Sequence, residues 1–459
     1  MFADDRVNLP DYFLADLPPE ATLVPGMVTE ACQTLKRNRA QYLAGRSTES
    51  IIERIADVAA SWRRHDYALR QFALARGPEQ LRFSQATLER GLDDFFAELT
   101  ADNLCALVLQ ELGHAQRLDG FAATSAEHAA NHASFALGSD LIAHVTAGNI
   151  PNPALMSIVL GLLVRSAQFV KCAQGAALLP RLFAHSIYEA DAKLGACLEI
   201  ADWPGGSAEL EAALFAEADC VTATGSDETL DAIRQRLPPK TRFLGYGHRV
   251  SFAFIAREVL SNAGARRLAQ DAAEDVTAWD QHGCLSPHLF YVQERGAVSP
   301  EQFAAMLAEA LARCEAAAPR GDLLLPEATT ITLKRDFYRV RAAASDETKL
   351  WHSEGSTAWT VVYEEDPRFQ HSCLNRFVYV KRATSLDDAL HHAELVRGQV
   401  STIGLAAPDD TARELVVRLA RWGVTRICPI GRMQRPPLTW RHDGRPALVD
   451  LIHWAGWER

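Results

Sequence analysis

From Asp140 onward the chain alternates short apolar runs with helical stretches, and this alternation is the feature that most limits its fold. Five runs have strand character, and a stretch of helical periodicity separates each from the next. They are residues 141–145, 168–171, 197–200, 220–223 and 242–245. Such spacing predicts βαβ units with right-handed crossovers and therefore a doubly wound parallel sheet. Ligands of such sheets bind at the carboxyl ends of the strands.

The segments on either side have different patterns. Residues 1–138 are mainly helical in pattern, with capping-box form at Ser50 opening a long amphipathic stretch. After residue 248, helical and strand-like runs again alternate, which predicts a second α/β domain. Its predicted strands are 358–364, 375–381 and 424–428, and its predicted helices are 300–318, 386–397 and 409–422. The tail, residues 436–459, is rich in Trp and Pro and is expected to pack on the body or on a partner subunit.

Composition excludes several classes of protein. A chain of 459 residues is long enough for two or three domains. The net charge of -11, with arginines scattered among acids, is unsuited to nucleic acid. The longest apolar run, residues 154–164, is about half the roughly 20 residues that cross a bilayer, so no integral membrane segment is expected. Nine unpatterned cysteines and a start without signal-peptide features favour the cytoplasm.

Cys284 is the first candidate for catalysis. It lies in a polar stretch, residues 279–288, between a helical pattern at 263–277 and a strand-like run at 289–292. A thiol in such a loop is open to a substrate, and thiolates are strong nucleophiles that carry acyl groups. His282 and His288 flank it and could lower its pKa. They could also be imagined as metal ligands, but a structural zinc site needs four ligands, so no metal is expected.

Three loops at the ligand-binding edge carry further candidates. Asn149 follows the first strand, Lys171 closes the second with Gln174 three residues on, and Thr224-Gly225-Ser226 follows the fourth. Each has a plainer explanation. Asn149 could cap the next helix, although Asn152 before Pro153 is the better cap. Lys171 could be a solvated charge, and Thr224–Ser226 an ordinary helix start. The glycine-rich dinucleotide fingerprint is absent after the first strand.

In this order, Asn149-Ile150-Pro151, Lys171 with Gln174, Thr224-Gly225-Ser226 and Cys284 resemble the aldehyde dehydrogenase superfamily. Three further segments are similar to the acyl-CoA reductases related to the fatty-acid reductase of bacterial luminescence. They are residues 247–252, 281–287 and 440–444. The resemblance implies a helical N-terminal region (1–138) packed on a dinucleotide-binding domain (139–247), a catalytic thiol domain (248–435) and a tail (436–459) that could serve oligomerisation.

The resemblance also implies roles for individual residues. Cys284 would be the nucleophile and Asn149 an oxyanion donor. The cofactor would be held by Lys171, Gln174, Thr224, Gly225 and Ser226, with Gly247 and His248 as candidate substrate or cofactor contacts.

Where this sequence departs from the superfamily, the differences are informative. Leu244 stands where hydrolytic members have a general-base Glu, so water is poorly activated. Gln174 replaces a ribose-binding Glu, which favours NADPH, with NADH still possible. The superfamily's Glu-x-Phe-Gly contact to the nicotinamide ribose is not evident, and residues 371–375 fall near its place.

These expectations amount to reduction of a fatty acyl-CoA, or acyl-carrier, thioester to an aldehyde through an acyl-cysteine. One alternative is a thiol acyltransferase or acyl-binding subunit that never handles hydride. Another is an aldehyde dehydrogenase that oxidises aldehyde to acid. The resemblance further implies a homo-oligomer built through an edge strand and an acyl-protein synthetase as a partner.

Overall fold

Five parallel strands form the first sheet, at the positions that the sequence predicts. In spatial order they run β4-β3-β2-β5-β6. Their bounds are β2 Leu141–Val145, β3 Ala167–Cys172, β4 Leu198–Asp202, β5 Cys220–Thr224 and β6 Arg242–Tyr246. The chain leaves β2 towards β3 and β4 and then returns to β5 on the other side of β2. The strand order therefore reverses between β2 and β5, and this is the point where such sheets bind ligands.

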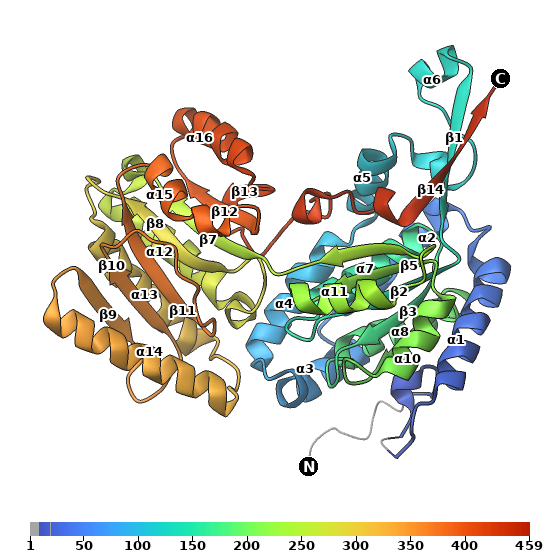
Figure 1. Cartoon of the computed structure of the whole chain (residues 1–459), viewed down its shortest axis with the longest axis horizontal. Coiled ribbons are helices and arrows are strands. Elements are labelled where there is room, and N and C mark those ends of the chain that lie inside the picture. Colours follow the sequence, from blue (N-terminus) through green and yellow to red (C-terminus); the bar gives the residue numbers. More distant parts are fainter. Residues whose placement is uncertain (1–8, 19) are drawn as a thin grey trace.

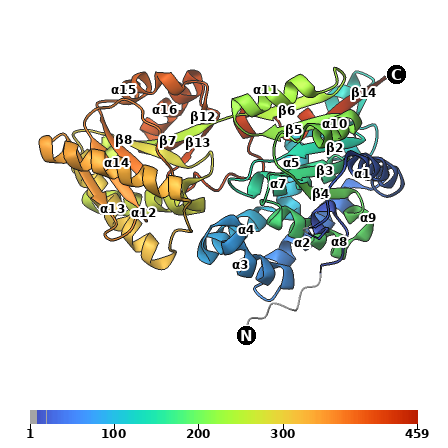
Figure 2. The ribbon, with the colours of Figure 1, turned by 60° about the horizontal axis from the view of Figure 1, so that its bottom comes forward.

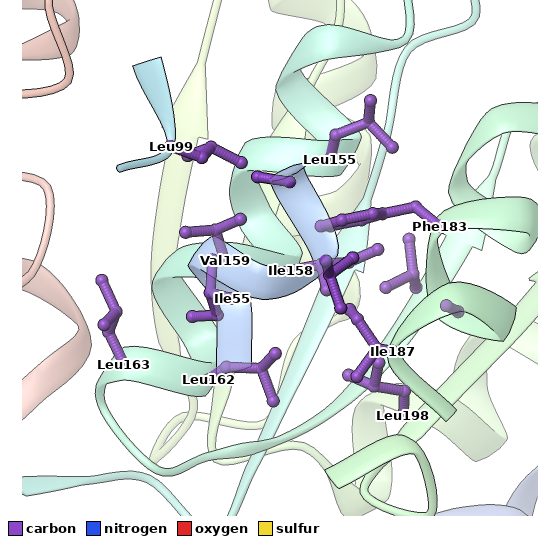
Figure 3. Packing of buried hydrophobic residues seen from close by; sticks show 14 of the residues in the cluster. Ile55, Leu99, Leu155, Ile158, Val159, Leu162, Leu163, Phe183, Ile187 and Leu198 are labelled. Atoms are coloured by element: carbon purple, nitrogen blue, oxygen red, sulfur yellow. The ribbon is translucent and has the colours of Figure 1, made fainter. Parts of the chain in front are cut away.

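The helices of this sheet are α7 (Asn152–Leu163), α8 (Leu178–Ala190), α9 (Ala192–Gly195), α10 (Ala208–Glu217) and α11 (Asp227–Arg236). Of these, α7 is apolar on nearly every side, so it needs cover on more than its sheet face. The N-terminal region supplies that cover. Figure 3 shows Ile55 of α2 beside Ile158 and Val159 of α7 and Phe183 of α8, all within one buried cluster.

The computed structural model describes residues 9–18 and 20–459, and its N-terminal part is largely helical, as expected. The successive elements are η1 (Leu14–Asp16), α1 (Pro25–Asn38), η2 (Arg39–Leu43), α2 (Thr48–Trp62), α3 (Ala68–Leu81), α4 (Gln85–Glu98), α5 (Ala101–Leu112), η3 (Ala115–Leu118) and α6 (Ser125–Ala129). The expected cap at Ser50 is wrong, because Ser47 caps α2 and accepts the Ser50 N–H. The single long stretch from that cap is also two helices, α2 and α3.

The end of this region differs from the expectation, because His132–Gly138 is a strand, β1. It pairs antiparallel with β14 (Ile452–Glu458), so that His132 lies opposite Glu458. In Figure 1 this two-stranded ribbon extends from the body at the C-terminal end of the chain. A local pattern cannot reveal such pairing, since the partner strand comes at the other end of the sequence.

The second sheet has seven strands in the order β13-β12-β7-β8-β11-β10-β9. All neighbours are parallel except β9, which is antiparallel to β10. The strands are β7 (Val250–Ile255), β8 (Pro287–Gln293), β9 (Thr348–His352), β10 (Thr360–Glu364), β11 (Phe377–Ala383), β12 (Val400–Ala406) and β13 (Arg426–Pro429). The longer helices are α12 (Asn262–Thr277), α13 (Pro300–Ala317), α14 (Leu325–Ala344), α15 (Leu386–His392) and α16 (Asp409–Trp422), with the short turns η4 (Arg257–Val259), η5 (Ala278–Gln281) and η6 (Glu394–Val396).

This domain is α/β, as expected, but richer than the sequence pattern indicates. Strands β7, β9 and β12 and the helix α14 have no counterpart among the predicted elements. Apolar clusters cover both faces of the sheet, so its strands read as continuous apolar runs without alternation.

The tail connects the two halves of the molecule. Figures 1 and 2 show the chain after β13 returning from the second sheet to the first, where η7 (His442–Gly444) and η8 (Val449–Leu451) precede β14. The tail therefore packs on the body, one of the two expectations. No helix within residues 9–18 and 20–459 combines the length and apolar character needed to cross a membrane.

Candidate active site

Cys284 lies in the loop between η5 and β8, where the two halves of the molecule meet. Its residue is partly exposed and lines a cavity of about 230 Å³. The Ser251 hydroxyl of β7 donates to the Cys284 carbonyl at 2.7 Å, which fixes the loop backbone at this point. The thiol is therefore reachable from a cavity, as a nucleophile must be.

The backbone leading to this thiol is unusual. Trp279, Asp280 and Gln281 have φ of 50°, 49° and 70°, a left-handed run without glycine. Such residues cost on the order of 1 kcal/mol or more each, and such strain is concentrated at functional sites. A second run of this kind, Leu374–Arg376, lies against the first.

Side chains join the two left-handed runs. Arg376 Nε donates to Asp280 Oδ1 at 2.9 Å, and its terminal nitrogen lies 2.6 Å from the same oxygen. Both side chains are almost completely buried. Nearby, His282 Nε2 and Asn375 Oδ1 are 2.9 Å apart. The thiol loop is thus held by a buried ion pair and a hydrogen bond.

Asn149 reaches the same loop from the first sheet. It follows β2, and its amide nitrogen donates to the His282 carbonyl at 2.9 Å. A carboxamide has two N–H groups, so one remains for another acceptor. The cap expected at Asn152 is wrong: α7 begins at Asn152 itself, after Pro151, and no side chain caps it.

The predicted cofactor residues lie at one edge of the first sheet. The strand register places Lys171, Val145, Ala223 and Gly245 in one row across β3, β2, β5 and β6. Thr224, Gly225 and Ser226 come next on their strand. Lys171 and Thr224 are thus on the same edge but separated by β2, as two ends of an extended ligand would require.

Individual side chains at this edge differ in burial. Lys171 is buried, and burial lowers its pKa despite the nearby carboxylate of Glu211. Its amino group lies 5.8 Å from the centre of the Trp203 ring. Gln174 is exposed. Ser226 caps α11 by accepting the Thr229 N–H at 3.3 Å, so it has the ordinary helix-start role that the sequence also allows.

Gly247 and His248 follow β6 and lie against α11. A Cβ on Gly247 would be 2.3 Å from Asp227 Oδ1, and the His248 N–H donates to that oxygen at 3.3 Å. The His248 ring faces His371, with ring centres 6.2 Å apart. Of residues 371–375, which the sequence comparison puts near the superfamily's nicotinamide contact, His371 is the one that lies beside His248.

Leu244 is buried inside β6 and does not line the cavity. Two residues later, Tyr246 does line it. The residue of β6 that reaches the cavity is therefore Tyr246, and not position 244, where hydrolytic members of the superfamily have their general base.

The two histidines beside the thiol do not lower its pKa, and that expectation is wrong. His282 is engaged by Asn375, and His288 Nδ1 accepts the Ser372 N–H at 3.0 Å. Burial raises the pKa of the Cys284 thiol to about 12, and the negative charge of Asp443 acts in the same direction.

Sequence reasoning missed the wall that the tail contributes to the cavity. The His442 ring stacks on Tyr246, with centres 4.8 Å apart and planes 11° apart, and the Trp440 ring centre lies 4.8 Å from the same imidazole. Arg249 holds Asp443 at 3.0 Å. The tail also contributes Leu438, and the remaining wall comes from α4, α7 with the loop before it, and the thiol loop, with Phe95, Ile150, Met156, Leu160 and Leu285 among its apolar members. The unusual Trp440–Gly444 segment was the one signal that could have indicated this.

A profile of the family described as "Acyl-CoA reductase (LuxC)" matches residues 43–454. The chain belongs to this family. Among its relatives, a long-chain acyl-protein thioester reductase of Vibrio harveyi is 23% identical over 322 residues, which cover 69% of this chain. The match spans 64% of that relative's length, just under two thirds. A protein of the same description from Photorhabdus laumondii is 22% identical over 417 residues, covering 89% of this chain and 82% of the relative.

Solved structures of aldehyde dehydrogenases share the fold of this family member. The NAD-dependent benzaldehyde dehydrogenase of Corynebacterium glutamicum superimposes with a TM-score of 0.66 at 14% identity, covering 95% of this chain and 91% of that one. A bifunctional proline utilization A protein reaches 0.71 at 18% identity, covering 97% of this chain and 46% of the larger protein. The aldehyde-dehydrogenase-like fold predicted from the sequence is confirmed.

Proposed function

We propose that this protein reduces a fatty acyl thioester to an aldehyde, using a reduced nicotinamide dinucleotide and a covalent acyl-Cys284 intermediate. The observation that carries the proposal is the position of the thiol. It lines a largely apolar cavity next to the switch point of a doubly wound sheet. An apolar wall suits an alkyl chain, and membership of the acyl-CoA reductase family supports a thioester substrate.

The residues at the sheet edge fit a dinucleotide. Gly148 and Gly225 lie in tightly packed loops at this edge: a Cβ on Gly148 would lie only 3.1 Å from the Ala173 Cβ, and one on Gly225 3.3 Å from Thr229 Cγ2. The α11 N-terminus and the Lys171 ammonium provide positive charge for phosphates and ribose hydroxyls. A bound reduced nicotinamide would supply the hydride.

The chain's own groups would carry out the acyl transfer. Cys284 sulfur attacks the thioester carbonyl, and the donor thiol leaves. The Asn149 amide and the Cys284 N–H stabilise the oxyanion, a contribution of roughly 3 kcal/mol for each donor. Because Leu244 carries no acid or base, position 244 offers no group to activate water. Hydrolysis of the acyl-enzyme is therefore not assisted from that position.

We propose NADPH as the preferred cofactor, with NADH possible, because the uncharged Gln174 does not repel a 2′-phosphate. A carboxylate of β4, Asp202, lies at the same edge and accepts the Gly175 N–H at 3.1 Å. Measuring the rates with NADPH and with NADH, in the wild-type protein and in D202N, shows whether the Asp202 carboxylate or the uncharged Gln174 sets the cofactor preference. A preference for NADH that D202N reverses would assign the selectivity to Asp202.

The rest of the proposal concerns organisation and setting. We propose that residues 139–247 bind the cofactor against the helical region 1–138, residues 248–435 carry the thiol, and residues 436–459 form the tail. The acyl donor is a CoA or protein-bound thioester, supplied by an acyl-protein synthetase. Nine free thiols suit the cytoplasm. The β1–β14 ribbon, with Trp454 and Trp457 43% and 46% exposed, is our candidate for homo-oligomer contact.

Acylation and reduction can be tested separately. Incubation with tetradecanoyl-CoA without nicotinamide should add one acyl mass to the protein, and C284A should abolish the adduct. C428A removes another partly exposed thiol and serves as the matched control. NADPH absorbance should then fall only when acyl donor is present. An undiminished rate in C284A would refute the proposal. An adduct without NADPH consumption would indicate an acyltransferase, and NAD-dependent oxidation of aldehyde without thioester chemistry an aldehyde dehydrogenase.

A further inference from the structure

The Cys284 thiol needs a base to become a nucleophile. Burial raises the pKa of this thiol to about 12, so little thiolate is present at pH 7. His282 and His288, its neighbours in sequence, are bonded to Asn375 and to the Ser372 N–H. Neither of these histidines is among the residues that line the cavity with Cys284, so a base that faces the thiol belongs to the cavity wall itself.

His442 is the one histidine among the described residues that line the cavity with Cys284. Its ring is held by Tyr246 on one side and lies 4.8 Å from the Trp440 ring centre. Within the described part of the chain, neither ring nitrogen has a hydrogen-bond partner; Nε2 is 3.9 Å from Asp443 Oδ1, too far for one. The side chain is thus fixed in place with its nitrogens free.

The charges around this ring suit a neutral base. Burial lowers the pKa of His442, Asp443 opposes that shift, and Arg249 and Arg445 reinforce it. At pH 7 the imidazole is therefore neutral and can accept a proton. Arg249 also ties this part of the tail to the thiol, because it pairs with Asp443 and stands two residues before Ser251, which bonds the Cys284 carbonyl.

The other acids on the cavity wall are already engaged. Asp94 of α4 pairs with Arg435 at 3.0 Å. Glu98, one turn further along α4, accepts from Asn103 through both its backbone carbonyl and its side chain. Unlike these two acids, His442 has no hydrogen-bond partner at either ring nitrogen among the described residues.

We propose that His442 is the general base and acid of the acyl transfer step, an inference that rests on the proposed function. A ring nitrogen takes the proton of the Cys284 S–H as the sulfur forms its bond to the thioester carbon. The bond from that carbon to the donor sulfur breaks, and its electron pair stays on the donor sulfur. The proton on His442 then passes to that sulfur. One thioester and one thiol are consumed and one of each is produced.

The test follows the rate at which tetradecanoyl-CoA acylates the protein without nicotinamide, by acid quench and intact mass, from pH 6 to pH 9. The variant H442F keeps an aromatic face on Tyr246 but has no nitrogen. H453F, at an exposed histidine of β14, is the matched control. We expect H442F to acylate 10²- to 10⁴-fold more slowly at pH 7, and H453F to match the wild-type protein.

The pH profile separates a proton-transfer role from a structural one. The wild-type rate should be nearly level above pH 7, whereas the H442F rate should rise about tenfold per pH unit as thiolate forms. Added imidazole should restore H442A and leave H442F unchanged. If H442F fails to fold, as judged by its thermal midpoint, H442Q and the imidazole rescue of H442A decide the question.

The outcomes distinguish the two proposals. If H442F acylates at the wild-type rate with the wild-type pH profile, the assignment of His442 is wrong and the proposed function stands. If H442A is slow and imidazole does not restore it, the assignment is also wrong. If the wild-type protein forms no adduct, the proposed function fails, and the role of His442 fails with it.

Discussion

Gly91 of α4 is the residue whose enlargement should disturb the thiol loop most selectively. A Cβ at this position would lie 2.0 Å from Cζ2 of Trp279 and 2.5 and 2.6 Å from two further ring atoms. Ordinary contacts begin at about 3.4 Å, so the ring would have to retreat by about 1.4 Å. Trp279 is buried and packs edge-on against Phe83 with ring centres 5.2 Å apart, which leaves little room for that movement.

The variant G91A therefore sets two effects against each other. Replacing Gly by Ala in a helix gains about 1 kcal/mol, while overpacking a core costs about 1 to 3 kcal/mol. We expect a net loss of about 1 kcal/mol in the free energy of unfolding, measured in urea. Because Trp279 starts the left-handed run before Cys284, we also expect acylation about 10² times slower, as for a 1 Å misplacement of a reacting group.

Two controls make this prediction sharp. In G26A the new methyl group has no atom within 4 Å, so that variant should be slightly stabilised and acylate normally. In G91A/W279F the smaller ring should recover part of the lost rate. If G91A is as stable and as fast as the wild-type protein, the thiol loop is not positioned by Trp279, and the reasoning is refuted.

Three further predictions follow from buried groups. Burial raises the pKa of Asp275 to about 7 although it accepts the N–H groups of Gly431 and Met433, just before the tail. Its neutral form is favoured on folding, so stability should fall as pH rises from about 4 to 7, and thermal midpoints of D275N should lack that part of the decline. D280N removes one carboxylate from the buried Arg376 guanidinium and leaves Glu315, 2.7 Å away, as its remaining one. We expect a loss of about 2 kcal/mol in urea unfolding, as for a hydrogen bond to a charged group; a loss below 1 kcal/mol would contradict this. M156W narrows the cavity and should shift kcat/KM from tetradecanoyl- towards octanoyl-CoA; an unchanged ratio would place the alkyl chain elsewhere.

The parts of the fold that the sequence predicts are those that local patterns encode. The five strands of the first sheet are short apolar runs between helices, and each forms where expected. The loop position of Cys284 follows from the same kind of pattern. The sequence also predicts that Lys171 and Thr224 lie at the same edge of the sheet, because the carboxyl ends of parallel strands share one edge.

The remaining features depend on contacts between distant segments. The pairing of β1 with β14 and the tail's share of the cavity wall leave no periodic signal. The left-handed run that starts at Trp279 contains no glycine, so the sequence gives no sign of it. The buried pair of Asp280 and Arg376 holds this backbone in place. The direction of the Cys284 pKa shift depends on distant contacts for the same reason: the sequence places histidines beside the thiol, whereas enclosure by the protein raises its pKa.

The tail is fastened at both ends. Asp275 accepts the N–H groups of Gly431 and Met433, just before the tail begins, and β14 is paired along its length with β1. The segment between these two contacts is therefore held in position by residues that lie far from the Cys284 sulfur. Occupation of the cavity should therefore slow the exchange of β14 amide hydrogens. Conversely, weakening the pairing of β1 with β14 should let this segment move away from the thiol.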